Sequence, residues 1–414
     1  MNKSVLLFII SCSALVTLFT FKHSNVTHGD LLSYQNTANN FHAYISGQTP
    51  RIDTVYPALA TNYFFFIKEN PFGLPFHIMW TIALLYFGCA TILIALYFFE
   101  GRHVRWLFPS ILFAALLLGG GSLFEGFDVI IMLLIFLMIA SFEAKSFVWT
   151  GFFLTVAIAL KTSPVFLIPL IYVACSGHRK NIMIGMIAGT IFCITIVTIT
   201  GGLGAFYNAT VSNLRAMRLY GIDVMSSLSA FDMLIHGMMG MKIPIGKIPS
   251  DPLPSWNTNF PHMTKTLLLI IIASACTVLP WLKKTADLRN NRYFFAASCA
   301  ILLLVLTLSP VFTPHYLFWV LPLVIMWLCE EYESGRYTWK QLLPITLAMV
   351  MTGLTTQWIF PTHWVLLQNS QPLHATIIHN IRTVSLIILT TLLWRSHHVL
   401  CTSDSIIRKN NVTT

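Results

Sequence analysis

The chain has 414 residues, of which 56% are hydrophobic and only 10% carry a charge. Soluble globular domains have about 25% charged residues, so this composition excludes that class and indicates a protein embedded in a membrane. The formal net charge of +10 is weak support for nucleic-acid binding. We expect membrane lipid, and no nucleic acid, as a partner.

Apolar runs recur along the whole chain. A helix needs roughly 17 to 25 apolar residues to cross the hydrocarbon layer, and about twelve runs approach this length. The sequence therefore predicts an all-α polytopic membrane protein. The first run lacks a small-residue cleavage site, so we expect a retained helix. The predicted spans are 4–21, 75–99, 107–124, 127–142, 147–161, 164–175, 182–205, 265–282, 293–309, 315–329, 341–358 and 377–394.

Lysine and arginine collect in alternate connections, which predicts that these connections and both termini are cytoplasmic. The two long segments, 22–74 and 206–264, then face outward. All eight cysteines fall in spans or on the inner side, so we expect no disulfide. With no cleavable leader and no retention signal, the sequence favours a bacterial inner membrane. Asn25 and Asn208 stand in glycosylation sequons, which also arise by chance.

Several functional motifs are missing from the sequence. There is no glycine-rich phosphate loop and no nucleotide-binding fingerprint, which excludes an ATP-driven pump with its motor in this chain. No metal-ligand spacing occurs either, so we predict no cofactor and no essential zinc, and leave open a loosely held divalent cation.

The first outer segment is rich in aromatic and amide side chains, which suit ligands that carry many hydroxyl groups. Residues 30–44 can form an amphipathic helix along the bilayer surface. Its two sides are Leu31, Tyr34 and Ala38 against Asn36, Asn39 and Asn40. Asp30 could cap this helix or serve as a general base. Asp53, beside Arg51, is expected to form a surface ion pair.

Three charged residues lie at predicted outer turns between spans. Glu125 and Asp128 flank one turn, where acids next to hydrocarbon are either functional or tolerated at the interface. Lys161 is the only basic residue in the short outer connections. It could reach the headgroups along its aliphatic stem or hold a phosphate.

The later part of the chain offers further candidates. Arg215 and Arg218 are three residues apart on a predicted helix, so they could grip a phosphate, bind lipid headgroups or pair with Asp223. His315 stands in a proline-bounded outer turn, where it could be a ligand or a simple hydrogen-bonding residue. The predicted spans carry almost no charge near their middle.

Taken in order, three stretches resemble the membrane-embedded GT-C glycosyltransferases, most closely glycosyltransferase family 87. They are "GDLLSYQNTANNFHAYISGQTP" with the following "YPALA", then "GFDVIIMLLIFLMIASFEAKSFVWTGFFLTVAIALKTSPVFLIPL", and "LSPVFTPHYLFWVLP". The resemblance implies a GT-C-like fold with a module of about seven spans in 1–205, an outer loop in 206–264 and more variable helices in 265–414.

The resemblance also implies a reaction, in which a hexose such as mannose moves from a polyprenyl-phosphate donor to an acceptor hydroxyl of a glycolipid, glycan or protein, with inversion. Asp30 matches the catalytic base, and Lys161 and His315 match substrate-binding positions. Asp128 stands where many relatives have an amide or another acid. We add Tyr34, Asp128 and the two arginines, Arg215 and Arg218, as substrate-binding candidates.

Other functions remain open at this stage. A flippase or transporter for a lipid-linked saccharide would need a wet cavity with charges along its path, and such proteins often contain internal repeats. A glycan polymerase or ligase would share the architecture and depend more on outer-loop arginines. A non-enzymatic scaffold is the last alternative.

Overall fold

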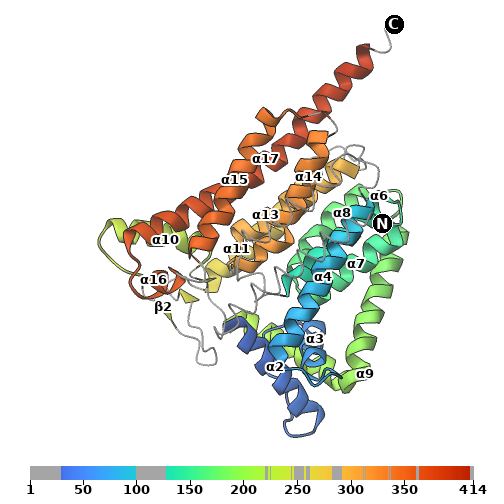
Figure 1. Cartoon of the computed structure of the whole chain (residues 1–414), viewed down its shortest axis with the longest axis vertical. Coiled ribbons are helices and arrows are strands. Elements are labelled where there is room, and N and C mark those ends of the chain that lie inside the picture. Colours follow the sequence, from blue (N-terminus) through green and yellow to red (C-terminus); the bar gives the residue numbers. More distant parts are fainter. Residues whose placement is uncertain are drawn as a thin grey trace. The chain divides into compact units, whose positions relative to one another are not determined.

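The computed structural model is mostly α-helical in its described residues, with three strands of two residues each (Figure 1). These residues are 29–98, 127–219, 222–223, 225–243, 245–246, 256–257, 262–281, 291–310, 312, 314–333, 335, 337–359 and 363–410. For Asp30, Arg218 and His315 only the backbone is described. The predicted spans 4–21 and 107–124, together with Glu125, lie outside the described residues.

Every predicted span within the described residues is occupied by helix. The helices are α2 (Gly29–Ile45), α3 (Ala58–Lys68), α4 (Phe76–Phe98), α6 (Asp128–Glu143), α7 (Phe147–Leu160), η3 (Ser163–Leu167), α8 (Ile168–Ala174), α9 (Arg179–Leu219), α10 (Ser227–Met238), α11 (His262–Trp281), α13 (Asn291–Leu308), η4 (Pro314–Trp319), α14 (Leu321–Glu333), α15 (Trp339–Trp358), α16 (Trp364–Asn369) and α17 (Leu373–Asn410). The predicted helical fold class is confirmed. Two described stretches are long and apolar enough to cross a membrane, Arg179–Arg215 and Leu373–Arg395.

The chain divides into two compact units. Unit 1 comprises residues 1–164, 180–220 and 247–254, and unit 2 comprises 165–179, 221–246 and 255–414. The short helix α8 thus belongs to unit 2, although the sequence grouped it with the first seven spans.

In unit 1, α6 and α7 form an antiparallel hairpin. α6 ends at Glu143, α7 begins at Phe147, and Lys145 between them has a φ of 57°, the left-handed conformation that reverses the chain. The two helices have 16 and 14 residues. Because each residue adds about 1.5 Å to a helix, the start of α6 and the residue after α7 return to the same end of the hairpin.

α9 packs directly against the backbone of α7. A Cβ atom added to Gly185 would lie 1.9 Å from the Val148 carbonyl oxygen, and one added to Gly151 would lie 2.3 Å from the Ile182 carbonyl oxygen. No side chain fits at these two contacts. Such close approach through glycine is common between helices inside membranes.

Beyond this contact, α9 bends at Gly202, whose φ of 77° and ψ of 171° are not helical. The following part of α9 packs on the first predicted outer segment. Ser212 Oγ accepts a hydrogen bond from the Thr54 amide (3.0 Å) and donates one to the Thr54 carbonyl oxygen (3.1 Å). The Asn213 amide group donates to the Val55 carbonyl oxygen. The first outer segment therefore contacts the beginning of the second.

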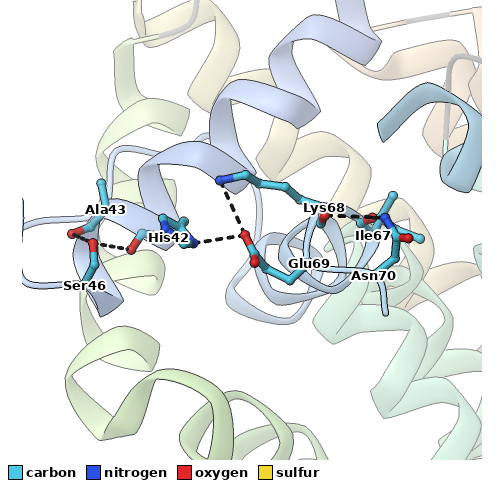
Figure 2. Close-up of polar contacts among 7 residues, drawn as sticks. All are labelled: His42, Ala43, Ser46, Ile67, Lys68, Glu69 and Asn70. Carbon is cyan, nitrogen blue, oxygen red and sulfur yellow. Dashed lines mark hydrogen bonds and ion pairs between the residues drawn. The ribbon is translucent and has the colours of Figure 1, made fainter. Parts of the chain in front are cut away.

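The amphipathic helix predicted in the first outer segment is α2, and its two sides are divided as expected. Tyr34 and Ala38 are buried, Leu31 is half-buried, and the asparagines of the other side are exposed. Figure 2 shows how the ends of α2 and α3 are joined: His42 Nδ1 lies 3.0 Å from Glu69 Oε1, which also lies 3.5 Å from Lys68 Nζ.

Unit 2 is organised around α17, which packs against α10, α13 and α15 and lies beside α15 in Figure 1. A capping box begins α15, since Thr338 and Gln341 satisfy each other's backbone amides. The strands β1 (Ile222–Asp223), β2 (Ile245–Gly246) and β3 (Trp256–Asn257) form a small antiparallel sheet in the order β1-β3-β2.

Candidate functional site

A cluster of aromatic rings in unit 1 surrounds Tyr34 of α2. We call it the Tyr34 cluster, and it consists of Tyr34, Tyr56, Phe64, Trp80 and Phe127. Tyr34 is 1% exposed, and its ring centroid lies 4.6 Å from that of Phe64 and 4.8 Å from that of Trp80. Each such ring pair contributes about 0.5–1.5 kcal/mol beyond its buried area. The cluster holds α2 firmly against α3 and α4.

Next to this cluster, Asp128 and Lys161 form a buried ion pair. Lys161 Nζ contacts Asp128 Oδ1, and the two side chains are only 12% and 1% exposed. The sequence named both residues as candidates without pairing them. A signal was present in the sequence, because two predicted spans of similar length, 127–142 and 147–161, are joined by only four residues and so bring their outer ends together.

Phe127 connects the ion pair to the Tyr34 cluster. Its ring centroid lies 5.8 Å from that of Tyr34 and 5.5 Å from Lys161 Nζ. A cation this close to an aromatic face is attracted to it. The structure therefore brings together three predicted site residues, Tyr34, Asp128 and Lys161.

Two residues of α3 add polar groups that sequence reasoning missed. Asn62 is completely buried, and neither its amide oxygen nor its amide nitrogen has a hydrogen-bond partner in the described part of the chain. The Tyr63 hydroxyl is likewise buried without a partner there, and burial raises the pKa of this phenol. Tyr63 lies against the cluster, with its ring centroid 5.8 Å from that of Trp80. Unsatisfied buried groups of this kind are rare and call for an explanation.

This arrangement has the chemical parts that a sugar site requires. Aromatic faces cover the apolar faces of a sugar ring, and amide and phenol groups bind hydroxyls. The ion pair adds a carboxylate that can accept a proton and an ammonium that can hold a phosphate oxygen. In this structure the ammonium already contacts Asp128, so a phosphate would share Lys161 with this carboxylate.

The first outer segment holds three more residues named from the sequence, which are Asp30, Arg51 and Asp53. Asp30 is the second residue of α2, one helical turn before Tyr34. It is therefore a first-turn residue and not the N-cap that the sequence suggested. Arg51 and Asp53 are both exposed, and the ion pair predicted between them is not formed. That prediction was wrong: both side chains are exposed to water, where an ion pair gains little free energy and does not hold two side chains together.

The two arginines lie on the last turns of α9. Arg215 is exposed, and Arg218 lies one turn later on the same helix. Asp223, the suggested alternative partner, is buried in β1 of unit 2, where its carboxylate accepts a hydrogen bond from the Met225 amide at 3.0 Å.

Unit 2 contains a second buried polar group, which the sequence analysis did not find. Arg382 of α17 is completely buried and donates through Nη2 to the Met225 carbonyl oxygen. The same nitrogen lies 2.7 Å from His379 Nε2, and the guanidinium carbon lies 4.3 Å from the centre of the Phe312 ring. Arg382 falls within the predicted span 377–394, although it lies nearer the beginning of this span than its middle.

The last predicted site residue, His315, belongs to unit 2. It lies in η4, which follows Pro310 and Phe312 in the sequence. The Phe312 ring contacts the Arg382 guanidinium, and the Pro310 carbonyl oxygen accepts a hydrogen bond from the Asp223 amide at 2.8 Å. The predicted residues are therefore split: His315 lies in unit 2 and the others in unit 1.

Within the described residues, no three His, Cys, Asp or Glu side chains gather in a way that could hold a metal ion. Four cysteines, Cys175, Cys193, Cys276 and Cys299, are buried with free thiols. Comparison with protein-family models, with characterised proteins and with solved structures finds no match to this chain. The Asp128–Lys161 pair and the Arg382 group are therefore the features from which a function can be inferred.

Proposed function

We propose that the chain is a multi-pass membrane protein of about twelve transmembrane helices, located in a bacterial inner membrane with both termini in the cytoplasm. The exposed surface of α9 supports this proposal, since only 28% of its most apolar stretch is buried within the chain. Its exposed side chains include Ile184, Ile187, Ile191 and Ile199. An apolar surface of this extent requires lipid or a partner protein to cover it.

Contacts within unit 1 support the proposed orientation. The segments 22–74 and 206–264 were both expected outside, and Thr54 and Val55 of the first bind Ser212 and Asn213 of the second. The Asp128 end of the α6–α7 hairpin contacts the Tyr34 cluster, which also belongs largely to the first segment. These contacts support a topology in which all of these groups lie on one side of the membrane.

We propose further that the chain is a GT-C type hexosyltransferase, which moves a hexose such as mannose from a polyprenyl-phosphate donor to an acceptor hydroxyl on a glycolipid, a glycan or a protein. The observation that carries this proposal is the convergence of the Tyr34 cluster with the Asp128–Lys161 ion pair. Asp30 lies one turn before Tyr34 on α2. This meeting of aromatic faces, a carboxylate and a cation suits a charged, sugar-bearing lipid at an interface.

In the proposed reaction, Asp30 accepts the proton of the acceptor hydroxyl while the acceptor oxygen forms a bond to the anomeric carbon from the face opposite the phosphate. The bond between this carbon and the phosphate oxygen breaks, with inversion. Negative charge grows on the departing phosphate, and a preorganised cation such as Lys161 stabilises that charge most strongly in the transition state. The substrate supplies the energy, so the reaction requires no nucleotide.

The test is transfer of radiolabelled mannose from polyprenyl-phosphate-mannose in membranes that contain equal amounts of each variant. Asp30→Asn keeps the shape of the side chain but cannot accept the proton, so we expect activity to fall by about 10²–10⁴-fold. Asp53→Asn is the matched control, because Asp53 is an exposed carboxylate of the same outer segment. We expect it to retain full activity.

Other outcomes would redirect the proposal. Equal transfer by the wild type and Asp30→Asn would remove Asp30 as the base and make Asp128 the next carboxylate to replace. No transfer by the wild type would overturn the donor assignment.

A transporter of lipid-linked saccharides is the second candidate function, and one observation favours it. Arg382 and His379 are buried in α17, a helix apolar enough to cross a membrane, and charged groups inside membranes often mark a transport path. Movement of a labelled lipid-linked saccharide across proteoliposomes, without any transfer of sugar, would support this function over the first.

A further inference from the structure

The N-terminus of α10 lies close to the buried Arg382 of α17. The Met225 carbonyl oxygen accepts a hydrogen bond from Arg382 Nη2, and Met225 directly precedes Ser226, the N-cap residue of α10. The guanidinium therefore contacts the residue that comes just before the N-cap of a twelve-residue helix. The unsatisfied amides at such a helix end carry partial positive charge and attract anions.

Arg382 has hydrogen-bonding capacity that the described residues do not use. Its Nε and Nη1 atoms are buried and have no hydrogen-bond partner among the described residues. An arginine has five N–H donors, of which these atoms carry three. Phe312 covers one face of the guanidinium, so the remaining donors lie in its plane.

The first turn of α10 contributes neutral donors. Ser226 Oγ accepts a hydrogen bond from the Ser229 amide at 3.1 Å, which leaves the amides of Ser227 and Leu228 at the helix end. The Ser227 hydroxyl is buried and has no partner in the described part of unit 2. Arg382 and the N-terminus of α10 therefore both carry hydrogen-bond donors that the described residues do not use, and Met225 connects the two.

Among the described side chains, the charged and titratable groups that contact or act on Arg382 are Asp223 and His379. The Asp223 carboxylate is bound by the Met225 amide, and its charge offsets part of that of Arg382. His379 Nε2 contacts both Arg382 Nη2 and the Met225 carbonyl oxygen, at 2.7 and 3.2 Å. Neither group occupies the free donors of Arg382.

We propose that the N-terminus of α10 and Arg382 form a binding site for a phosphate group. A compact oxyanion matches this donor set, because its several oxygens can accept from a guanidinium, a hydroxyl and two backbone amides together. The Asp223 carboxylate lowers the attraction for an anion, so we expect inorganic phosphate to bind weakly. The site lies wholly in unit 2, and its existence does not depend on sugar transfer.

The experiment measures the thermal unfolding midpoint of the purified full chain in detergent. Sodium phosphate is compared with sodium chloride at equal ionic strength and pH. In a second arm, a long-chain alkyl phosphate is compared with the corresponding alkyl maltoside. We expect phosphate to raise the midpoint by about 2–5 °C in a saturable manner. A rise with both phosphates indicates free phosphate as a sufficient ligand, and a rise with the alkyl phosphate alone indicates a lipid phosphate.

The variants test whether the rise comes from this site. Arg382→Gln should abolish it, and Arg395→Gln, the same change at an exposed position of the same helix, should preserve it. Ser227→Asp places a carboxylate at the helix end, where it favours the helix but excludes an anion. It should abolish the rise without unfolding α10, which keeps the test valid if Arg382→Gln does not fold. No specific rise in the wild type, or an equal rise in both Arg382→Gln and Ser227→Asp, would overturn the proposal.

Discussion

The buried charges of the two units are accommodated in different ways. In unit 1, Lys161 contacts the carboxylate of Asp128 and lies near an aromatic ring. In unit 2, Arg382 contacts a backbone carbonyl oxygen, a histidine and an aromatic ring, and several of its N–H donors remain unused by the described residues. A lysine that meets a carboxylate is largely neutralised within the protein. An arginine with free donors retains the capacity to bind something else.

The largest expected effect comes from separating the ion pair in unit 1. Lys161→Met removes the cation and leaves the Asp128 carboxylate buried beside apolar groups. We expect a loss of about 3–5 kcal/mol in the free energy of unfolding. The measurement is unfolding in denaturant, and the double variant Asp128→Leu with Lys161→Met should recover most of the loss. If the double variant is as unstable as the sum of both single variants, the two residues are not coupled.

An intermediate effect is expected where α7 and α9 meet. Gly185→Ala brings a Cβ atom against the Val148 carbonyl oxygen and must push the helices apart, at a cost of about 1–3 kcal/mol. Gly353→Ala in α15 of unit 2 is the control, because a Cβ atom there meets no atom within 4 Å. Thermal unfolding of the two variants should differ clearly, and equal midpoints would contradict the close packing.

The smallest effect is expected at Arg382. Arg382→Met removes a buried cation whose donors are only partly used. The variant loses the hydrogen bond to Met225, but it no longer has to bury a charge, and the two effects largely cancel. We expect the free energy of unfolding to change by about 1 kcal/mol or less. A loss as large as that of Lys161→Met, measured by the same denaturant unfolding, would show that the two units bury their charges alike.

The helical framework could be predicted from the sequence because apolar runs of this length can form few structures other than a helix. The two sides of α2 could also be predicted, since helical periodicity separates Tyr34 from Asn36 in any surroundings. The spacing of the α6–α7 hairpin contained the information for the Asp128–Lys161 pair, but the pairing depends on how two helices pack. At Arg51 and Asp53, closeness in the sequence led to the prediction of an ion pair that the structure does not contain.

Arg382 was missed for a different reason. The mean hydropathy of a window combines a single charged residue with its apolar neighbours, so one arginine within a span hardly lowers the mean and is not noticed. Its partners, Met225 and Phe312, come from distant parts of the chain, and their positions depend on the fold of unit 2. The strands of two residues in the same region are too short for an alternating pattern.

The hydrogen bonds between the Thr54 region and Ser212 have a consequence for biosynthesis. These residues are 158 positions apart. A ribosome therefore exposes α2 and α3 long before it makes the helix that completes their packing, and contacts this distant in sequence form late. Truncated chains that are released from the ribosome and end before about residue 213 should leave the first outer segment open to proteases, and longer chains should protect it.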